Sequence, residues 1–406
     1  SYRLSYLLGE TMYLFKGTIP KEPDDQEIMI AGAHNHLLMP ESIGQYYPFS
    51  GNQFWYPHQQ WVNKIKQINP HLLLYTGNQV NPDQPVAADL SGSEHLYLDY
   101  LYKWYLFCWS QRELSKDIPA VILPGSGDYY RDSLPEEAGR KPHTADTSEH
   151  VPLSFIRMVQ RTQTAHLPEP YDPDLDQRGI PSYNTSLVYG GVSFAVLEDR
   201  KFHNSADSPA IEQEQTYRNR QIKFIREWAD NWKGIHMKAV ITREPFACLS
   251  SETPSQGTNR PAAINTSNVG QQQPEKLRDK TTNGWPPETR DQLLREIRKA
   301  HALIITGGED PAHVVHHGID EWEDASYAFA LPPMIKNHSR GWYVTDTARA
   351  YRMAGTPFTG RFQDAFGNKI TVKAILNPVS TPSLSDSGNR QGSGYGLIRF
   401  DKKSQQ

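Results

Sequence analysis

Polar residues follow most of the short apolar runs in this sequence, and chemistry is expected at these positions. In open α/β sheets, the loops at the carboxyl ends of the strands form the binding and catalytic sites. Together, these loops contain few of the carboxylates and imidazoles that a two-metal hydrolytic site requires. The groups that follow successive predicted strands are AHNHL (33–37), GNQV (77–80), GSGDYY (125–130), EDRK (198–201), TREP (242–245) and GGEDPAHVVHHG (307–318).

Alternating strand-like and helix-like segments position these groups, a pattern typical of an α/β fold. Apolar residues recur at helical spacing between several strands, and the aromatic segment 93–117 predicts a long buried helix. The pair Gly190-Gly191 predicts a hairpin turn. The predicted strands are EIMIAG (27–32), HLLLYTG (71–77), AVILPG (120–125), SLVYGGVSFAVLED (186–199), MKAVIT (237–242), ALIITGG (302–308), SYAFAL (326–331) and KITVKAIL (369–376).

Composition argues against several classes of partner. The 406 residues include 42 basic and 46 acidic side chains, mixed along the chain, with a net charge of -4. Phosphate-backbone binding needs a basic surface, so we expect no nucleic-acid partner. The apolar runs are far shorter than the roughly 20 residues of a membrane span, so none is expected. Cys108 and Cys248 lie far apart and predict neither a zinc site nor a disulfide framework.

The sequence pattern divides the chain into three parts. Residues 1–26 form a β segment, predicted to be the remnant or edge of a preceding β-domain, and the start at Ser1 without Met suggests a processed or longer chain. Residues 27–377 form the main domain, interrupted by a polar insertion at 250–284, and residues 378–406 form a C-terminal loop and strand.

Long collinear segments carry a resemblance to a known family. These are DYLYKWYLFCWSQRELSKDIPAVILP, FIRMVQRTQTAHLPEPYDP, SLVYGGVSFAVLEDRKF, NGWPPETRDQLLREIRKAHALIITGGED and VVHHGIDEWEDASYAF. Over most of residues 27–377 the chain resembles the alkaline phosphatase D-like (PhoD-like) branch of the metallophosphoesterases. The resemblance implies a two-sheet β-sandwich flanked by helices, with two divalent metal ions such as Fe, Ca, Zn or Mn at the carboxyl edge. It also implies a secreted or extracellular location.

The chain departs from the family where the resemblance implies metal ligands. Gly77-Asn78 replaces Gly-Asp, and Gly125-Ser126-Gly127 followed by Asp128 replaces Asp-Asp-His followed by an acid. Gly307-Gly308-Glu309-Asp310 replaces Gly-Asp-x-His, and Ala33-His34-Asn35 replaces a Ser-Cys-Asn-like turn. The vestigial metal-site positions are His34, Asn35, Asn78, Gly125, Ser126, Gly127, Asp128, Gly308, Glu309 and Asp310.

These departures predict that the chain holds no metal cofactor. A two-metal site needs several anionic oxygens to balance about four positive charges. Asn78 is neutral, and the glycines have no side chain. Asp128, Glu309, Asp310 and His34 remain as ligands for one cation, which does not recreate a bridging hydroxide. Asn78 is expected to preserve the shape of its turn, because asparagine tolerates turn conformations.

Other polar residues have a functional and a simpler interpretation. Arg200 and Lys201 suit oxyanion contacts or, equally, form a solvated charge run after a strand. The adjacent His316 and His317 are expected on opposite faces of a strand, where they do not bind one metal. Glycosylation sequons begin at Asn184, Asn265 and Asn337, and such triplets also occur by chance.

Three functional classes follow from the sequence. The departures favour a pseudo-phosphatase that acts as a structural or self-assembling extracellular protein, with itself as partner in a homo-oligomer or filament. The alternative is an active metal-dependent phosphomonoesterase or phosphodiesterase with rebuilt ligands, so enzymatic activity stays open. A third class is a glycan or ligand binder whose cleft is lined by Tyr129 and Tyr130.

Overall fold

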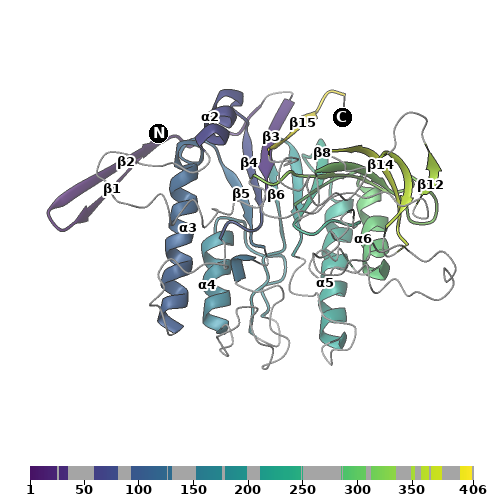
Figure 1. Cartoon of the computed structure of the whole chain (residues 1–406), viewed down its shortest axis with the longest axis horizontal. Coiled ribbons are helices and arrows are strands. Elements are labelled where there is room, and N and C mark those ends of the chain that lie inside the picture. Colours follow the sequence, from purple (N-terminus) through teal and green to yellow (C-terminus); the bar gives the residue numbers. More distant parts are fainter. Residues whose placement is uncertain are drawn as a thin grey trace, which may run out of the picture.

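The computed structural model shows two β-sheets packed face to face between layers of helices, with a separate hairpin standing out from one flank (Figure 1). The structure describes residues 1–24, 27–34, 59–80, 93–125, 127–129, 152–175, 179–198, 211–247, 249, 285, 287–307, 312–334, 349–352, 358–364, 367–376 and 394–404.

The smaller sheet has four strands in the order β15-β3-β4-β5. Strands β3, β4 and β5 run parallel, and β15 pairs antiparallel with β3. All five residues of β4 are buried, which is expected of a continuous apolar run covered on both faces. The strands are β3 (Glu27–Ala33), β4 (Leu72–Thr76), β5 (Ala120–Leu123) and β15 (Gly396–Asp401).

The larger sheet has nine strands in the order β12-β13-β14-β10-β11-β9-β8-β7-β6. Strands β7, β8, β9 and β11 are parallel, and the outer strands on both sides are antiparallel. The predicted turn at Gly190-Gly191 is confirmed, since it joins β6 to β7 and both glycines have positive φ. The strands are β6 (Thr185–Tyr189), β7 (Val192–Val196), β8 (Met237–Thr242), β9 (Leu303–Thr306), β10 (His313–His317), β11 (Tyr327–Ala330), β12 (Arg349–Arg352), β13 (Gly360–Gln363) and β14 (Lys369–Ile375).

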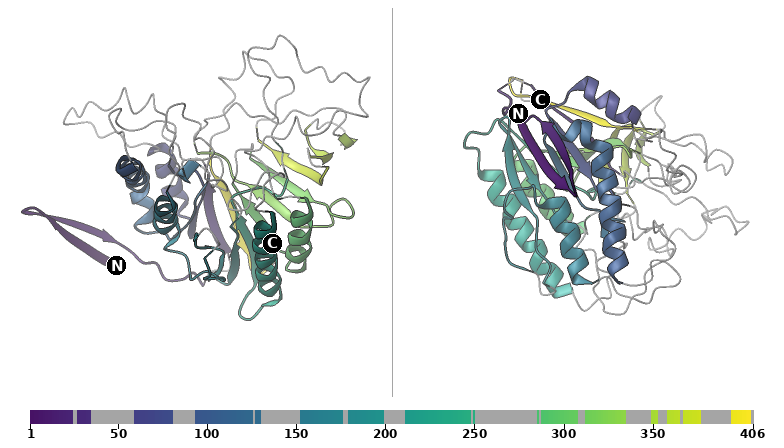
Figure 2. Two further views of the ribbon diagram at one scale, coloured as in Figure 1. Left: turned by 90° about the horizontal axis from the view of Figure 1, so that it is seen from below. Right: turned by 90° about the vertical axis from the view of Figure 1, so that its left-hand side faces the viewer.

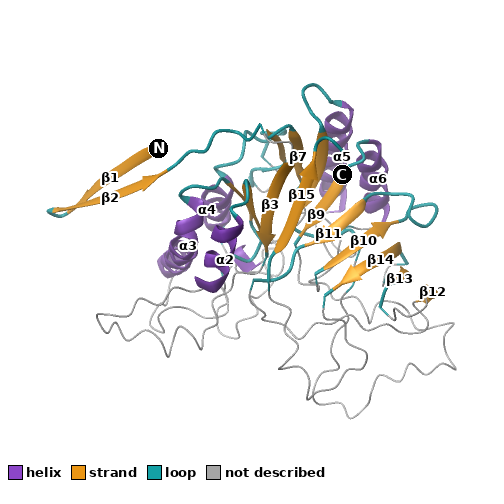
Figure 3. Cartoon of the chain, turned by 90° about the horizontal axis from the view of Figure 1, so that it is seen from above, coloured by secondary structure: helices purple, strands orange, loops and turns teal. Residues whose placement is uncertain are grey.

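The core lies in layers between and outside the sheets. Ile30, Leu74, Phe194, Ile241 and Phe400 belong to the cluster buried between the two sheets. Figure 3 shows α2, α3 and α4 on the side of the smaller sheet and α5 and α6 on the side of the larger one. The helices are α2 (Gln59–Ile68), α3 (Ser93–Ser115), α4 (Leu153–Thr164), α5 (Ile211–Asp230) and α6 (Pro287–Lys299), with a 3-10 turn, η1 (Gly127–Tyr129). The predicted two-sheet sandwich flanked by helices is therefore confirmed.

The N-terminal hairpin pairs β1 (Tyr2–Leu8) with β2 (Thr11–Gly17) in antiparallel register. It contacts the body near its base and projects away from it in the left-hand view of Figure 2. No helix in the described part of the chain is long and apolar enough to cross a membrane.

The strand list from the sequence was incomplete. Residues 313–317, expected within a strand-end loop, form β10, and the short strands β12 and β13 were not predicted. Three histidines in HVVHH give a weak β signal, although burial alternates along the strand. The expectation that His316 and His317 face opposite sides is confirmed, because His316 stacks on Tyr327 while His317 is buried beside Arg290.

Candidate functional site

The carboxyl ends of the central strands meet at one edge of the sandwich. His34 follows β3, Asn78 follows β4, and Gly125 and Asp128 follow β5. The described positions after β4 and β5 where the sequence resemblance implies metal ligands are joined by hydrogen bonds. The fifth residue at this edge, Arg243, directly follows β8 of the other sheet.

Asp128 ties two strand-end loops together. Its Oδ2 accepts the backbone N–H groups of Gly125 at 2.6 Å and Asn78 at 2.8 Å, and its Oδ1 accepts that of Val80 at 2.7 Å. The side chain is fully buried, and this burial raises the pKa of the Asp128 carboxyl to about 6 although the backbone donors lower it. Both oxygens are therefore engaged in holding the backbone.

Asn78 adopts the left-handed conformation, with φ of 57°. Asparagine visits this region more readily than most residues, which explains its use after Gly77. Its Oδ1 accepts the Gly127 N–H at 3.1 Å, so the amide also binds the β5 loop. Asn78 thus forms the turn after β4 and also binds the loop after β5.

The Arg243 side chain lies among the other residues of this edge, and Arg243 is only 2% exposed. A Cβ atom on Gly77 would lie 2.8 Å from Nε of Arg243, and one on Gly125 would lie 2.7 Å from the same atom. Neither distance is compatible with a side chain. The two glycines therefore leave the space that the arginine fills.

A buried ion pair balances the Arg243 charge. The Arg243 guanidinium donates to the carboxylate of Glu244, which is 1% exposed, and the Arg243 carbonyl accepts the Thr306 hydroxyl at 3.0 Å. The sequence pointed to this residue only through its position in TREP, directly after a strand, and gave it no role. Arg243 is the important site residue that sequence reasoning missed.

His34 joins the two sheets at the same edge. Its N–H donates to the Pro332 carbonyl at 3.1 Å, and its carbonyl accepts the Met334 N–H at 2.7 Å. Burial and the Arg243 guanidinium lower the pKa of His34 to about 3, so the imidazole is neutral near pH 7. Its Nε2 is buried and, within the described part of the chain, makes no hydrogen bond.

These residues do not fit a pair of metal ions. A binuclear site needs open coordination positions surrounded by anionic oxygens. Here the oxygens of Asp128 accept backbone donors, Asn78 is neutral, and a guanidinium, whose positive charge disfavours a neighbouring cation, fills the space between Gly77 and Gly125. Across the described ranges, no group of three or more His, Cys, Asp or Glu side chains is arranged to hold a metal.

Several sequence candidates lie outside the described residues: Asn35, Ser126, Gly308, Glu309, Asp310, Arg200, Lys201, Asn265, Asn337 and Tyr130. Two others are buried. Asn184 is 2% exposed and its side chain contacts the Ser182 hydroxyl, and Tyr129 packs in an apolar cluster with Phe155. We therefore expect no glycan on Asn184 in the folded chain.

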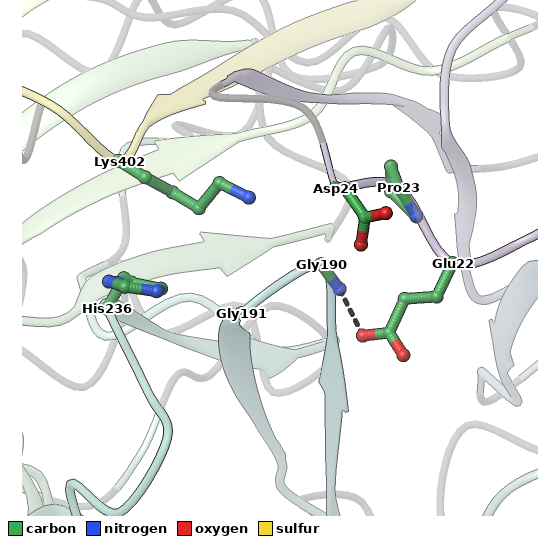
Figure 4. Close-up of a pocket in the computed structure, with 7 residues that line it drawn as sticks. All are labelled: Glu22, Pro23, Asp24, Gly190, Gly191, His236 and Lys402. Carbon is green, nitrogen blue, oxygen red and sulfur yellow. Dashed lines mark hydrogen bonds between the residues drawn. The ribbon is translucent and has the colours of Figure 1, made fainter.

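A pocket lies at the opposite edge of the sandwich, near the amino ends of β7 and β8 (Figure 4). Glu22, Asp24, His236 and Lys402 surround it, together with the Gly190-Gly191 turn. The Glu22 carboxylate accepts the Gly190 N–H at 2.7 Å, and Asp24 pairs with Lys21. The Glu22 contact holds the N-terminal segment on the sheet, and the pocket lies at the far edge, so we assign it no part in the strand-end site.

Comparisons with known proteins give limited similarity. No family model matches the sequence, and no curated protein matches it significantly. Among solved structures, PhoD matches with 12% identity and a TM-score of 0.48, over 81% of this chain and 61% of that chain. A dimetal phosphatase from Danio rerio matches with 8% identity and a TM-score of 0.41, over 75% of this chain and 87% of that chain. Similarity at this level carries no argument about activity.

Proposed function

We propose that this chain is a catalytically degenerate relative of the PhoD-like metallophosphoesterases that serves as a structural, self-assembling extracellular protein. The proposal rests on the buried Arg243 guanidinium between Gly77 and Gly125, at the edge where the sequence resemblance implies two metal ions. The extracellular location rests on the exported relatives alone.

The chemistry of the side chains supports the part of this proposal that concerns catalysis. Metal-assisted hydrolysis depends on a cation that binds water, lowers the pKa of that water and contacts the leaving oxygen. A guanidinium has no coordination position for water, and Arg243 is already paired with Glu244. Asp128 and Asn78 bind backbone groups of the loops. The edge is thus held together by fixed charges and hydrogen bonds.

Metal loading tests the proposal. The purified chain is incubated with Fe, Ca, Zn or Mn in turn, and metal content, hydrolysis of nitrophenyl phosphate and thermal unfolding with and without EDTA are measured. We expect less than one bound ion per chain, no turnover and no change of melting temperature with EDTA. Two bound ions with metal-dependent turnover would overturn the proposal in favour of rebuilt ligands.

A matched pair of variants makes this test sharper. One carries Asn78→Asp with Gly125→Asp, and the other carries the same changes with Arg243→Ala. Because Arg243 fills the space beside Gly125, restored carboxylates alone are expected to leave metal affinity unchanged, while the variant that also lacks Arg243 gains affinity in calorimetry. Equal affinities in two folded variants would show that Arg243 does not exclude the metal.

A further inference from the structure

The N-terminal hairpin exposes an apolar face that a soluble protein rarely leaves bare. Leu4, Tyr6, Tyr13 and Phe15 lie on one face, because Leu4 pairs with Phe15 and Tyr6 pairs with Tyr13 across the strands. Tyr6 stacks on Tyr13 with ring centroids 4.9 Å apart, yet Leu4 remains 61% exposed. A hairpin of two strands is marginally stable in water and needs a third strand or a helix against its apolar face.

A second apolar surface lies on α3. Leu98, Leu101, Tyr102 and Tyr105 are exposed, and their spacing of three and four residues places them in one stripe along the helix. Tyr105 alone is 59% exposed. The stripe lies on the helix surface away from the smaller sheet, because Tyr100, Phe107 and Leu114 point into the core.

The base of the hairpin is attached to the body, and its strands extend away from α3 of the same chain. Its base is bound at the C-terminal end of that helix, where the Tyr2 hydroxyl and the Thr18 N–H both donate to the Lys116 carbonyl at 3.1 Å. The Thr18 N–H also lies 3.0 Å from the Asp117 carboxylate. From this base the strands diverge from the helix (Figures 1 and 2).

We propose that the hairpin of one chain packs its Leu4–Tyr6–Tyr13–Phe15 face on the Leu98–Tyr105 stripe of a second copy, and that the second copy returns the same contact. The two surfaces are both apolar, and the hairpin face, about 7 Å long over two strand residues, fits within the stripe, about 10 Å long over seven helical residues. Each chain has one hairpin and one stripe, so a two-fold exchange covers both surfaces and closes the assembly. The paired contacts also double the buried area.

Light scattering over a dilution series tests this interface with substitutions on exposed side chains. The parent is compared with Tyr6→Lys on the hairpin, Tyr105→Lys on the stripe, and Val188→Lys, which is equally exposed on β6 and serves as control. Parent and control are expected to show twice the chain mass. Each of the other variants should dimerise at least about tenfold more weakly, as for a buried aromatic anchor at an interface.

Mixing the two variants distinguishes hairpin–stripe packing from other arrangements of the dimer. When the two variants are combined, the intact hairpin of the Tyr105→Lys chain can pack on the intact stripe of the Tyr6→Lys chain. We therefore expect a heterodimer at concentrations at which neither variant dimerises alone. A dimer that resists Tyr105→Lys but not Tyr6→Lys would mean hairpin-to-hairpin pairing and would overturn the proposal. So would a parent that stays monomeric at every concentration or that floats with phosphatidylcholine vesicles instead of dimerising. This interface deepens the self-assembly in the proposed function, but metal content does not enter its test. A monomeric parent would therefore overturn the assembly, while the loss of metal binding is decided separately by the metal-loading experiment.

Discussion

The carboxylate of Asp128 accepts the backbone N–H of Asn78 at 2.8 Å, while the Asn78 side chain accepts the N–H of Gly127, next to Asp128. Each residue thus holds the other's loop. Two positions where the sequence resemblance implies metal ligands instead join the ends of β4 and β5. The turn keeps its shape through hydrogen bonds that need no ion.

Substitution of Asn78 separates the two roles of this residue. Asn78→Gly loses the side-chain hydrogen bond and should lower the free energy of unfolding by about 1 kcal/mol. Asn78→Ala loses the same bond and also holds alanine at φ of 57°, so the free energy of unfolding should fall by about 1 kcal/mol more. Urea unfolding measures both values.

The exposed Asn69 provides the control, since its φ is 52°. Asn69→Ala and Asn69→Gly should differ by the same amount as the Asn78 pair if backbone conformation is the cause. An Asn78 pair of equal stability would show that conformational strain at this turn is negligible.

Gly125→Ala tests the close packing at the strand-end site. The new Cβ would lie 2.5 Å from Oδ1 of Asn78 and 2.7 Å from Nε of Arg243, so we expect a loss of about 2 kcal/mol or more in unfolding free energy. Gly394→Ala is the matched control, because its nearest neighbour, Cγ of Pro332, is 3.9 Å away. Similar losses in both variants would contradict this account.

Arg243 and Glu244 form a buried pair whose members should depend on each other. Arg243→Met leaves the Glu244 carboxylate buried without its guanidinium and should cost about 3–5 kcal/mol. The double variant Arg243→Met/Glu244→Gln should cost less than the sum of the single changes. Chemical denaturation of the four proteins gives the coupling energy.

An exposed ion pair provides the control for these substitutions. Arg295 makes two hydrogen bonds to Asp320, at 2.6 and 2.7 Å, but both side chains are largely exposed. Arg295→Met is therefore expected to cost no more than about 1 kcal/mol. Additive effects at Arg243 and Glu244 would mean that the two side chains do not depend on each other.

His317 should make the protein sensitive to acid. Burial and the neighbouring Arg290 guanidinium lower the pKa of His317 well below its usual value of 6.5, so the folded state keeps the ring neutral. The stability contributed by the neutral ring is present above pH 6.5 and is lost as the pH falls below it, by up to about 1.4 kcal/mol per pH unit for one proton.

The His317→Gln variant has no titrating ring at this position. Its unfolding free energy should therefore fall less steeply with decreasing pH than that of the parent. His236→Gln, at an exposed position, is the control. Parallel pH profiles for the parent and His317→Gln would refute the assignment.

Much of the fold could be read from the sequence because its strongest signals are local. The run LLLYT has no polar residue for a solvent face, and in the structure β4 is buried on both sides. Gly190-Gly191 predicted its turn for an equally local reason, the need for positive φ. Strand β10 was missed because its three histidines hide an alternating burial pattern.

The site was harder to predict because it depends on contacts between distant segments. Gly77 follows a strand of the smaller sheet and Arg243 follows a strand of the larger one, and only the packing of the two sheets brings them together. No spacing in the sequence reports this. The absence of a side chain at Gly125 was visible in the sequence, but its contact with Arg243 was not.

The pairing of β15 with β3 affects how the protein is made. These strands are neighbours in the smaller sheet, yet 362 residues separate Ala33 from Gly396. At a translation rate of about 5–20 residues per second, β3 leaves the ribosome roughly 20–70 s before its partner is synthesised. Throughout that interval the edge of β3 that pairs with β15 has no partner, so a nascent chain of this protein offers chaperones, or other nascent chains, an open sheet edge until β15 is synthesised.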